Sequence, residues 1–396
     1  MSIVCSRIGG WSICEKFKGS IPMMKRVASL ALLASAVATS FAASAAPKWE
    51  GPLSPKLMFL HPAPGPALQY PQGHAPTGQL PQWNGGFTDL TGHAITYTMA
   101  GADPSTSNTA THIKTFIIPV VFVYGASNGN QTLDPTAKGT GGLKKKSVIK
   151  ALLASPLFDD GADFVSGSID CGTAQYIDSY QRCNFWSSVQ TNTGYHTILD
   201  YTKDKKLKPM TLTVSSSQGS IIDNPYGAGQ VGTYPYSGFQ SQVNSYINSH
   251  KKDITPDTFP LFISYAVYLT SGGCCIGGYH NALGHQPGGQ TYGYSTYVND
   301  DTAFSRDIDA VSHEIGEWMD DSFVDNFVNC QDNSIMENGD PLEGLPNYGT
   351  FTVSLNGKTW HPQSLVFQPY FGAPKSTSAN GWVALHNDIT NVCPGQ

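Results

Sequence analysis

The stretch His313-Glu314-Ile315-Gly316-Glu317 decides how this sequence is interpreted. On an α-helix, positions i and i+4 lie on one face, one turn apart. His313 and Glu317 are therefore expected to hold one metal ion between them, with Glu314 beside it. This is the layout of the H-E-x-x-H helix of metallopeptidases. Glutamate, which also binds zinc, stands in place of the second histidine.

Apolar residues around this stretch recur at helical spacing. The stripe consists of Phe304, Ile308, Val311, Ile315 and Trp318. Thr302 is the expected N-cap. His313 and Glu317 fall roughly opposite the stripe, so the alternative to a metal site is a solvent-exposed helix face that carries an incidental histidine and glutamate.

A metal site needs a third ligand, and the segment Met336-Glu337-Asn338-Gly339-Asp340 offers one. Glu337 is the first choice. Asp340 is the second choice, or a hydrogen-bond partner of His313. Because one histidine and two carboxylates leave Zn²⁺ formally neutral, Mn²⁺ and Ca²⁺ are alternatives to Zn²⁺. Ordinary Asn/Gly/Asp turn chemistry is the other explanation of this segment.

The chemistry expected of such a site is peptide hydrolysis. The metal polarises a water molecule and the scissile carbonyl, and Glu314 accepts the proton of the water and passes it to the leaving amine. Tyr279 and His280, together with His285, are the candidate donors to the oxyanion. They belong to the stretch 272–289, which is expected to be a loop. The alternative is a disulfide-held loop whose histidines are merely exposed.

The chain opens with a predicted secretory signal peptide. Lys25-Arg26 precede an Ala/Leu-rich run over 27–39, and Ala43-Ser44-Ala45 is a small-residue cleavage site. The run is too short to span a bilayer. Met23 and Met24 are alternative starts. We therefore expect a secreted or periplasmic protein without a membrane anchor.

Charge excludes some partners. The whole chain has 23 basic and 29 acidic residues, and removal of residues 1–45 takes away five basic residues and one acidic residue. The remaining 18 basic and 28 acidic residues give a net charge of −10. Nucleic acid and anionic lipid are therefore not expected as partners.

Six cysteines follow residue 45, an even number that suggests disulfides in an exported chain. They are Cys171, Cys183, Cys274, Cys275, Cys330 and Cys393. Cys171 and Cys183 are expected to pair because they are close in sequence. Since adjacent cysteines rarely bridge each other, Cys274 and Cys275 are expected to reach Cys330 and Cys393. The alternative is a zinc site formed by these cysteines, but the chain has no C-x-x-C pair that would support it.

Three regions are predicted: residues 1–45 as the signal peptide, 46–110 as a Pro/Gly-rich leader or linker, and 111–396 as a metal-binding domain. Strands are expected at 115–124, 210–214, 259–269 and 295–298. Helices are expected at 147–157, 178–189 and 239–247. The run 259–269 is apolar on both faces and is expected to be central. Together these elements predict an α+β fold, a zincin-like mixed sheet with an active-site helix and a loop-rich, disulfide-bonded C-terminal part.

Several islands resemble the exordium / phosphate-induced protein family, which is known from plants and has bacterial relatives. They are Gly278-Tyr279-His280, then residues 312–317, then Glu337-Asn338-Gly339-Asp340. The block 175–186, QYIDSYQRCNFW, is similar to exported bacterial relatives. The resemblance extends over roughly residues 115–396 as separate islands. It implies a metal site and an extracellular role, and the family is noted for roles in growth.

Two function classes follow. The first is an exported metal-dependent peptidase, a hydrolase acting on a peptide or protein substrate. The second is a non-catalytic, metal-stabilised extracellular protein that binds cell-wall carbohydrate or a protein partner. Glu314 distinguishes them, because a structural metal site has no use for a general base at that position.

Overall fold

The computed structural model describes residues 3–8, 11–16, 53–56, 66–68, 78–201, 207–299, 304–331 and 334–394. The chain divides into two compact units, Met1–Ala45 and Ala46–Gln396. In the first unit, β1 (Ile3–Ile8) pairs with β2 (Trp11–Lys16). The predicted signal run and its cleavage site lie outside the described residues. Within the described part of the chain, no helix has the length and apolar character needed to cross a membrane.

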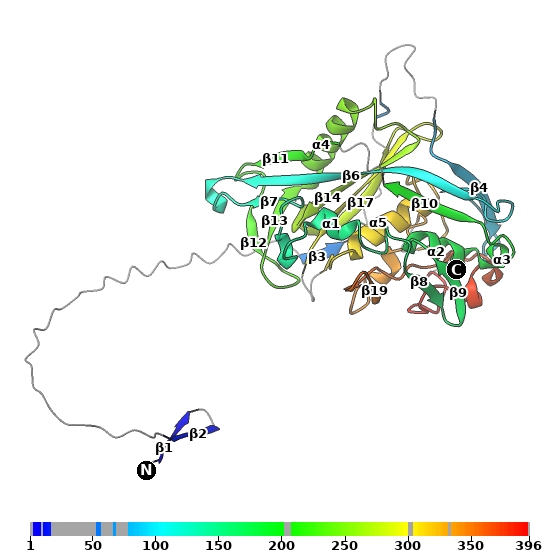
Figure 1. Ribbon diagram of the computed structural model, residues 1–396. Coiled ribbons are helices and arrows are strands. Elements are labelled where there is room, and N and C mark those ends of the chain that lie inside the picture. Colours follow the sequence, from blue (N-terminus) through cyan, green and yellow to red (C-terminus); the bar gives the residue numbers. More distant parts are fainter. Residues whose placement is uncertain are drawn as a thin grey trace, which may run out of the picture. The chain divides into compact units, whose positions relative to one another are not determined.

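A seven-stranded sheet forms the centre of the second unit (Figure 1). Its main path runs β10 (His196–Tyr201), β6 (Ala110–Tyr124), β14 (Thr258–Tyr265), β18 (Gln290–Tyr297) and β17 (Gly278–Leu283). The first four strands are parallel, and β17 is an antiparallel edge strand. β11 (Met210–Val214) and β7 (Thr132–Leu133) pair with the C-terminal half of β6.

The sheet is buried on both faces because its strands are apolar at odd and even positions alike. In β6, Ile113 and Ile117 enter one core cluster, and Phe116 and Ile118 enter another. Helices α1 (Val148–Leu152), α2 (Tyr176–Asn184) and α5 (Asp309–Asp320) contribute to the first cluster. Helix α4 (Tyr236–Ser249) contributes to the second. The sheet therefore lies between two helical layers, with α5 against β17 and β18.

The remaining strands form a second sheet and three hairpins. The second sheet runs β12 (Ile221–Asp223), β13 (Gln230–Pro235), β15 (Val267–Thr270), β16 (Cys274–Ile276) and β3 (Leu53–Lys56). The hairpins are β4 (Gln82–Thr88) with β5 (Ala94–Ala100), β8 (Asp163–Ser166) with β9 (Ile169–Thr173), and β19 (Val353–Leu355) with β20 (Lys358–Trp360). Short helical turns are α3 (Trp186–Val189) and the 3₁₀ helices Ala126–Asn128, Thr140–Gly142, Asp340–Leu342, Gln368–Phe371, Lys375–Thr377 and Ala379–Gly381.

The predicted α+β class is confirmed, as are the strands at 115–124 and 210–214 and the helix at 239–247. The run 259–269 is central as predicted, but it divides into β14 and β15 at Ala266, whose φ is +50°. The helix predicted at 147–157 is only the short α1, and the helix at 178–189 divides into α2 and α3. The strand predicted at 295–298 is the end of the longer β18.

Two larger predictions were wrong. Residues 272–289 are not a loop, because they form β16 and β17. Residues 46–110 are not only a leader or linker, because they contain β3 and the β4–β5 hairpin, whose Tyr97 and Met99 are buried in a core cluster. The helix expected from Phe304 onwards begins at Asp309, and its predicted N-cap, Thr302, lies outside the described residues.

The six cysteines that follow residue 45 form three disulfides. Cys171–Cys183 is confirmed. The pairing predicted for the other four was wrong: Cys274 bonds to Cys275, and Cys330 bonds to Cys393. The reason is their placement, since the first pair lies in one buried cluster and the second pair in another. The Cys330–Cys393 bond holds together a C-terminal part that has little regular structure beyond β19, β20 and short 3₁₀ helices.

Candidate metal centre

Helix α5 is buried over its whole length, which rules out the solvent-exposed face considered as an alternative. Its apolar side packs on the central sheet, where Trp318 stacks on Phe259 at 3.8 Å between ring centroids. The Trp318 indole N–H also donates to Thr291 Oγ1 at 2.9 Å. The C-terminal segments pack close to the helix, since a Cβ on Gly316 would lie only 2.4 Å from Leu365 Cδ1. The polar residues of the helix therefore lie inside the protein.

His313 is held in one orientation by its Nδ1 atom, which lies 2.8 Å from Gln363 Oε1. The Gln363 amide nitrogen donates to the carbonyls of Gly339 and Tyr348, so the amide oxygen must face the imidazole. His313 Nδ1 is then the donor. Its other nitrogen, Nε2, faces Glu317 Oε2 at 2.9 Å and Asp340 Oδ1 at 3.6 Å. Such an orienting contact is typical of a metal-binding histidine.

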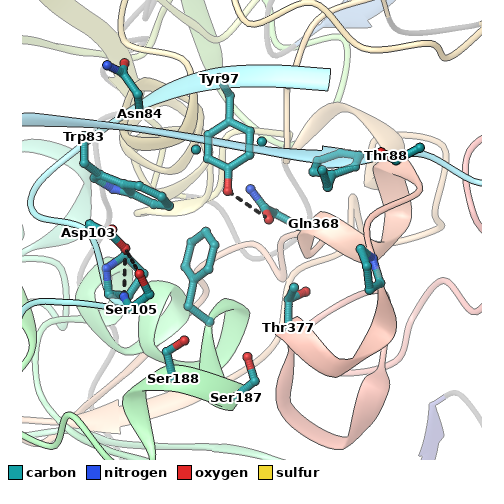
Figure 2. Close-up of a pocket in the computed structure, with 16 residues that line it drawn as sticks. Trp83, Asn84, Thr88, Tyr97, Asp103, Ser105, Ser187, Ser188, Gln368 and Thr377 are labelled. Carbon is teal, nitrogen blue, oxygen red and sulfur yellow. Dashed lines mark hydrogen bonds between the residues drawn. The ribbon is translucent and has the colours of Figure 1, made fainter. Parts of the chain in front are cut away.

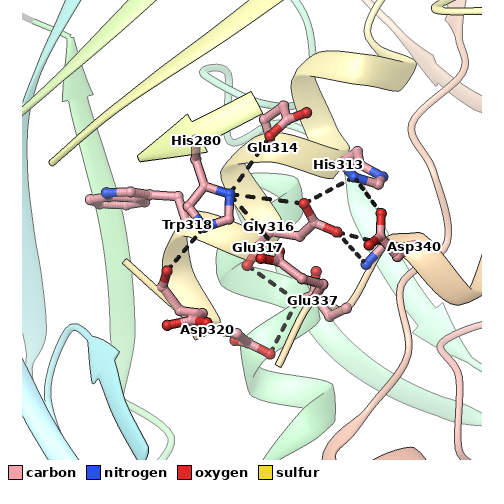
Figure 3. A network of polar contacts seen from close by, with 12 residues as sticks. His280, His313, Glu314, Gly316, Glu317, Trp318, Asp320, Glu337 and Asp340 are labelled. Carbon is pink, nitrogen blue, oxygen red and sulfur yellow. Dashed lines mark hydrogen bonds and ion pairs between the residues drawn. The ribbon is translucent and has the colours of Figure 1, made fainter. Parts of the chain in front are cut away.

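His280, on β17, is oriented in the same way. Its Nε2 atom lies 3.0 Å from the backbone carbonyl of Asp321, which can only accept, so Nε2 is the donor. The Nδ1 atom faces three carboxylates, Glu314 Oε2 at 3.7 Å, Glu317 Oε2 at 3.9 Å and Glu337 Oε2 at 4.0 Å. The two imidazoles thus approach Glu317 from different elements (Figure 3).

Glu317 is the centre of this cluster. Its Oε1 atom accepts the backbone N–H groups of Gly339 at 3.1 Å and Asp340 at 3.2 Å, which leaves Oε2 toward both histidines. The Glu317 and Glu337 carboxyls are also hydrogen-bonded to each other. A side chain at Gly339 is excluded, because its Cβ would lie 2.3 Å from His313 Nδ1. The segment 337–340 therefore lies directly against α5, as the ligand prediction requires.

Tyr279 does not join the cluster. Successive residues of a strand point to opposite faces of the sheet, so His280 faces α5 and Tyr279 faces away from it. The Tyr279 ring packs edge-on against Tyr236, at 5.0 Å between centroids. Its predicted catalytic role is therefore corrected. His285 is exposed beyond the end of β17 and does not join the cluster either. Gly278 leaves room for the Glu314 side chain, because a Cβ at this position would lie 2.6 Å from Glu314 Cγ.

Burial is the main influence on the pKa values of the centre. None of its six titratable residues exposes more than 7 % of its surface: His280, His313, Glu314, Glu317, Glu337 and Asp340. Burial raises the pKa of Glu314 well above its usual range, and His313 offsets only part of this. Burial and then the nearby Glu317 raise the pKa values of Glu337 and Asp340 in the same direction. Burial also raises the pKa of Glu317, but His313, His280 and the hydrogen bond to Glu337 together lower it by more, so the net shift is downward.

The residues present fit a divalent cation. Neither carboxylate oxygen of Glu314 or of Asp340 has a hydrogen-bond partner among the described residues, and a buried polar group without one is costly. Ligand atoms gather within 4.8 Å of one another in two groups, His280 with Glu314 and Glu317, and His313 with Asp340 and Glu343. Imidazole and carboxylate donors suit Zn²⁺ and Mn²⁺.

Sequence reasoning missed Gln363 and the Asp321 carbonyl, which orient the two histidines. Neither has a sequence signal of its own. Gln363 follows His313 by 50 residues in an irregular segment, and a backbone carbonyl contact carries no residue preference.

A separate cleft lies between the β4–β5 hairpin, α3 and the C-terminal turns (Figure 2). It has a volume of about 580 Å³ and an aromatic wall made of Trp83, Phe87, Tyr97 and Phe185. Tyr97 OH donates to Gln368 Oε1 at 3.4 Å, and the Gln368 amide nitrogen has no hydrogen-bond partner among the described residues. Serines 187 and 188 line the opposite side.

Comparisons with protein-family models, with curated proteins and with solved structures found no match to this chain. The resemblance to the exordium / phosphate-induced protein family therefore stays a prediction from its sequence islands.

Proposed function

We propose that this protein is an exported metal-dependent peptidase whose centre is built on helix α5. The observation that carries the proposal is Glu314, a carboxylate with 1 % of its surface exposed and no hydrogen-bond partner among the described residues. It follows directly on His313 and lies 3.7 Å from His280 Nδ1. A carboxylate that is buried without hydrogen-bond partners, next to residues able to bind a metal, is expected to have a chemical role.

The roles of the residues follow from their positions. His313, Glu317 and Asp340 are the first candidates to hold the cation, Zn²⁺ or alternatively Mn²⁺ or Ca²⁺, with Glu337 adjacent to Glu317. When bound, the cation polarises a water molecule and a substrate carbonyl. Glu314 accepts the proton of the attacking water and passes it to the leaving amine. Gln363 and the Asp321 carbonyl keep the two imidazoles in fixed orientations.

The substrate class is suggested by β17. Among the described strands it pairs only with β18, and it carries His280 at its middle. An extended peptide that adds to the outer edge of β17 would pass directly beside the metal-binding set, although all six residues of the strand are buried in this structure. This is the arrangement that a zincin-like peptidase would need. Export is part of the proposal, and the disulfides are compatible with it.

The test is metal analysis combined with a peptide-cleavage screen. Purified protein is expected to contain a divalent metal and to cleave members of a random peptide library, and a chelator is expected to stop the cleavage. His313→Ala is expected to lower both metal content and cleavage. A metal-loaded wild type that cleaves no peptide would reject the peptidase and leave a metal-stabilised protein.

The second candidate function is a non-catalytic protein that binds cell-wall carbohydrate or a protein partner. It is favoured by the near-complete burial of the centre and by the aromatic cleft of Figure 2. Aromatic walls with nearby amide and hydroxyl groups suit sugar rings, which have apolar faces and polar edges. Binding of soluble cell-wall oligosaccharides, lost in Trp83→Ala with metal content unchanged, would support this candidate.

A further inference from the structure

We infer that the centre holds two divalent cations that share the Glu317 carboxylate. This inference deepens the proposed function and rests on its claim that the cluster binds metal. The first cation lies among His313, Glu317 and Asp340, and the second lies among His280, Glu317 and Glu337.

The two half-sites have the same composition. Each consists of one imidazole nitrogen, the Oε2 atom of Glu317 and one carboxylate from the segment 337–340. In the first, His313 Nε2 faces Glu317 Oε2 at 2.9 Å and Asp340 Oδ1 at 3.6 Å. In the second, His280 Nδ1 faces Glu317 Oε2 at 3.9 Å and Glu337 Oε2 at 4.0 Å. The ligands of one ion lie at such separations, since each is about 2.0–2.2 Å from the metal.

The histidines themselves indicate two cations. Each has one nitrogen fixed as a donor, His313 Nδ1 to Gln363 and His280 Nε2 to the Asp321 carbonyl. In the neutral imidazole, the remaining nitrogen then carries a lone pair. Each of these nitrogens faces carboxylate oxygens, His313 Nε2 at 2.9 Å from Glu317 Oε2 and His280 Nδ1 at 3.9 Å from the same atom. A positive charge is needed between each nitrogen and these oxygens, and a divalent cation at each histidine supplies it.

Glu317 is fixed for a bridging role. Its Oε1 atom is committed to the backbone N–H groups of Gly339 and Asp340. The carboxylate cannot rotate without losing both hydrogen bonds, so Oε2 stays between the two imidazoles. Glu314 and Asp340 add further buried carboxylate oxygens without hydrogen-bond partners among the described residues. One divalent cation compensates only two of the four carboxylates Glu314, Glu317, Glu337 and Asp340 when all are ionised, and buried charge without compensation is costly.

The half-sites also explain why Glu337 and Asp340 are difficult to rank as ligands from sequence. They are three residues apart and each lies beside a different histidine. Glu314 Oε2 lies 3.7 Å from His280 Nδ1 and therefore also borders the second half-site, where it keeps its proposed role as the base.

The test is the metal content of the full chain after removal of metal and reloading with Mn²⁺. About two Mn²⁺ per chain are expected, with an electron paramagnetic resonance signal of two spin-coupled ions. One ion per chain, or two ions without spin coupling, would overturn the inference and leave the proposed function intact. No bound metal would overturn the proposed function as well.

Single variants assign the half-sites. Asp340→Asn and Glu337→Gln are each expected to retain about one uncoupled ion, and Glu317→Gln is expected to lose both. Asp223→Asn, at an exposed position of β12, is the matched control and keeps two. Circular dichroism checks that each variant is folded, and the wild-type measurement does not depend on any of them. Loss of all bound metal in both the Asp340 and the Glu337 variant, with both folded, would mean one shared ion.

Discussion

The candidate metal centre and the aromatic cleft differ in whether their carboxylates have hydrogen-bond partners within the protein. In the centre, Glu314 and Asp340 are buried with no hydrogen-bond partners for their carboxylates among the described residues. In the cleft, Asp103 accepts hydrogen bonds from the backbone N–H and the hydroxyl of Ser105, at 2.8 and 2.7 Å. The first region holds buried carboxylates that a bound cation would match, whereas the second leaves uncharged groups, the Gln368 amide nitrogen and the Thr377 hydroxyl, without partners among the described residues. Ligand removal should therefore matter for stability in the first region and for binding alone in the second.

The largest expected effect is kinetic and concerns Glu314. Glu314→Gln keeps the shape of the side chain but cannot accept a proton, so peptide cleavage should fall by about 10²–10⁴-fold. Metal content and melting temperature should stay near those of the wild type. Rates measured on a cleaved library peptide, with metal analysis of the same sample, check this. Unchanged cleavage would remove Glu314 from the mechanism, and loss of metal would make it a ligand instead.

Metal removal should come next in size. A ligand that binds only the folded state stabilises it by ~4 kcal/mol at a free concentration about 1,000 times its Kd. Chelator treatment should therefore lower the melting temperature clearly, and added metal should restore it. Trp83→Ala in the cleft should show the same difference between chelated and loaded protein. A melting temperature that the chelator does not change would contradict the contrast between the two regions.

Loss of a disulfide is expected to lower the free energy of unfolding, and the effect should be larger for the longer loop. Cys330 and Cys393 are 63 residues apart, and Cys171 and Cys183 are 12 apart. From loop length alone, replacing both cysteines by serine should cost about 4 kcal/mol for the longer loop and about 3 kcal/mol for the shorter. Denaturant unfolding of the two double variants measures this.

Metal affinity separates the two double variants further. The longer loop contains Glu337 and Asp340, so only the Cys330→Ser/Cys393→Ser variant should bind Mn²⁺ more weakly. Equal affinity in both variants would show that the bond does not help to position this segment.

The smallest effect is expected in the cleft. If it binds a sugar or peptide ring, Trp83→Ala should weaken that binding by about tenfold, close to the ~1.4 kcal/mol of one lost aromatic contact. Titration calorimetry with cell-wall oligosaccharides measures this, with Leu90→Ala, an exposed residue of the β4–β5 turn, as the control. A loss of metal in Trp83→Ala would mean that the two regions are not independent.

The sequence predicts helix α5 well and the elements around it poorly. The i, i+4 spacing of His313 and Glu317 is local, so the helix that joins them could be predicted directly. His280, which the sequence predicts as an oxyanion donor, lies on a strand more than thirty residues earlier, and its position beside Glu317 follows only from the fold. Burial of the helix was likewise not predictable from its own polar face, because the covering segments come from the C-terminal part.

Other errors have physical causes of the same kind. The wrong cysteine pairing came from the rule that adjacent cysteines rarely bridge each other, whereas the observed pairing depends on which core cluster holds each residue. The β4–β5 hairpin has a local signal of its own, because Ile95, Tyr97 and Met99 alternate with polar residues, as expected of a half-buried strand. Neighbouring prolines concealed it by making the whole stretch 46–110 resemble a linker.

The pairing of β3 with β16 has a practical consequence for handling this protein. β3 (Leu53–Lys56) runs parallel to β16 and forms the last strand of the five-stranded sheet. A recombinant protein shortened to begin at the β4–β5 hairpin would leave the outer edge of β16 exposed. Unprotected sheet edges recruit other chains and promote aggregation. Poor solubility of such a truncated protein would therefore reflect a missing strand rather than a failure of the core to fold.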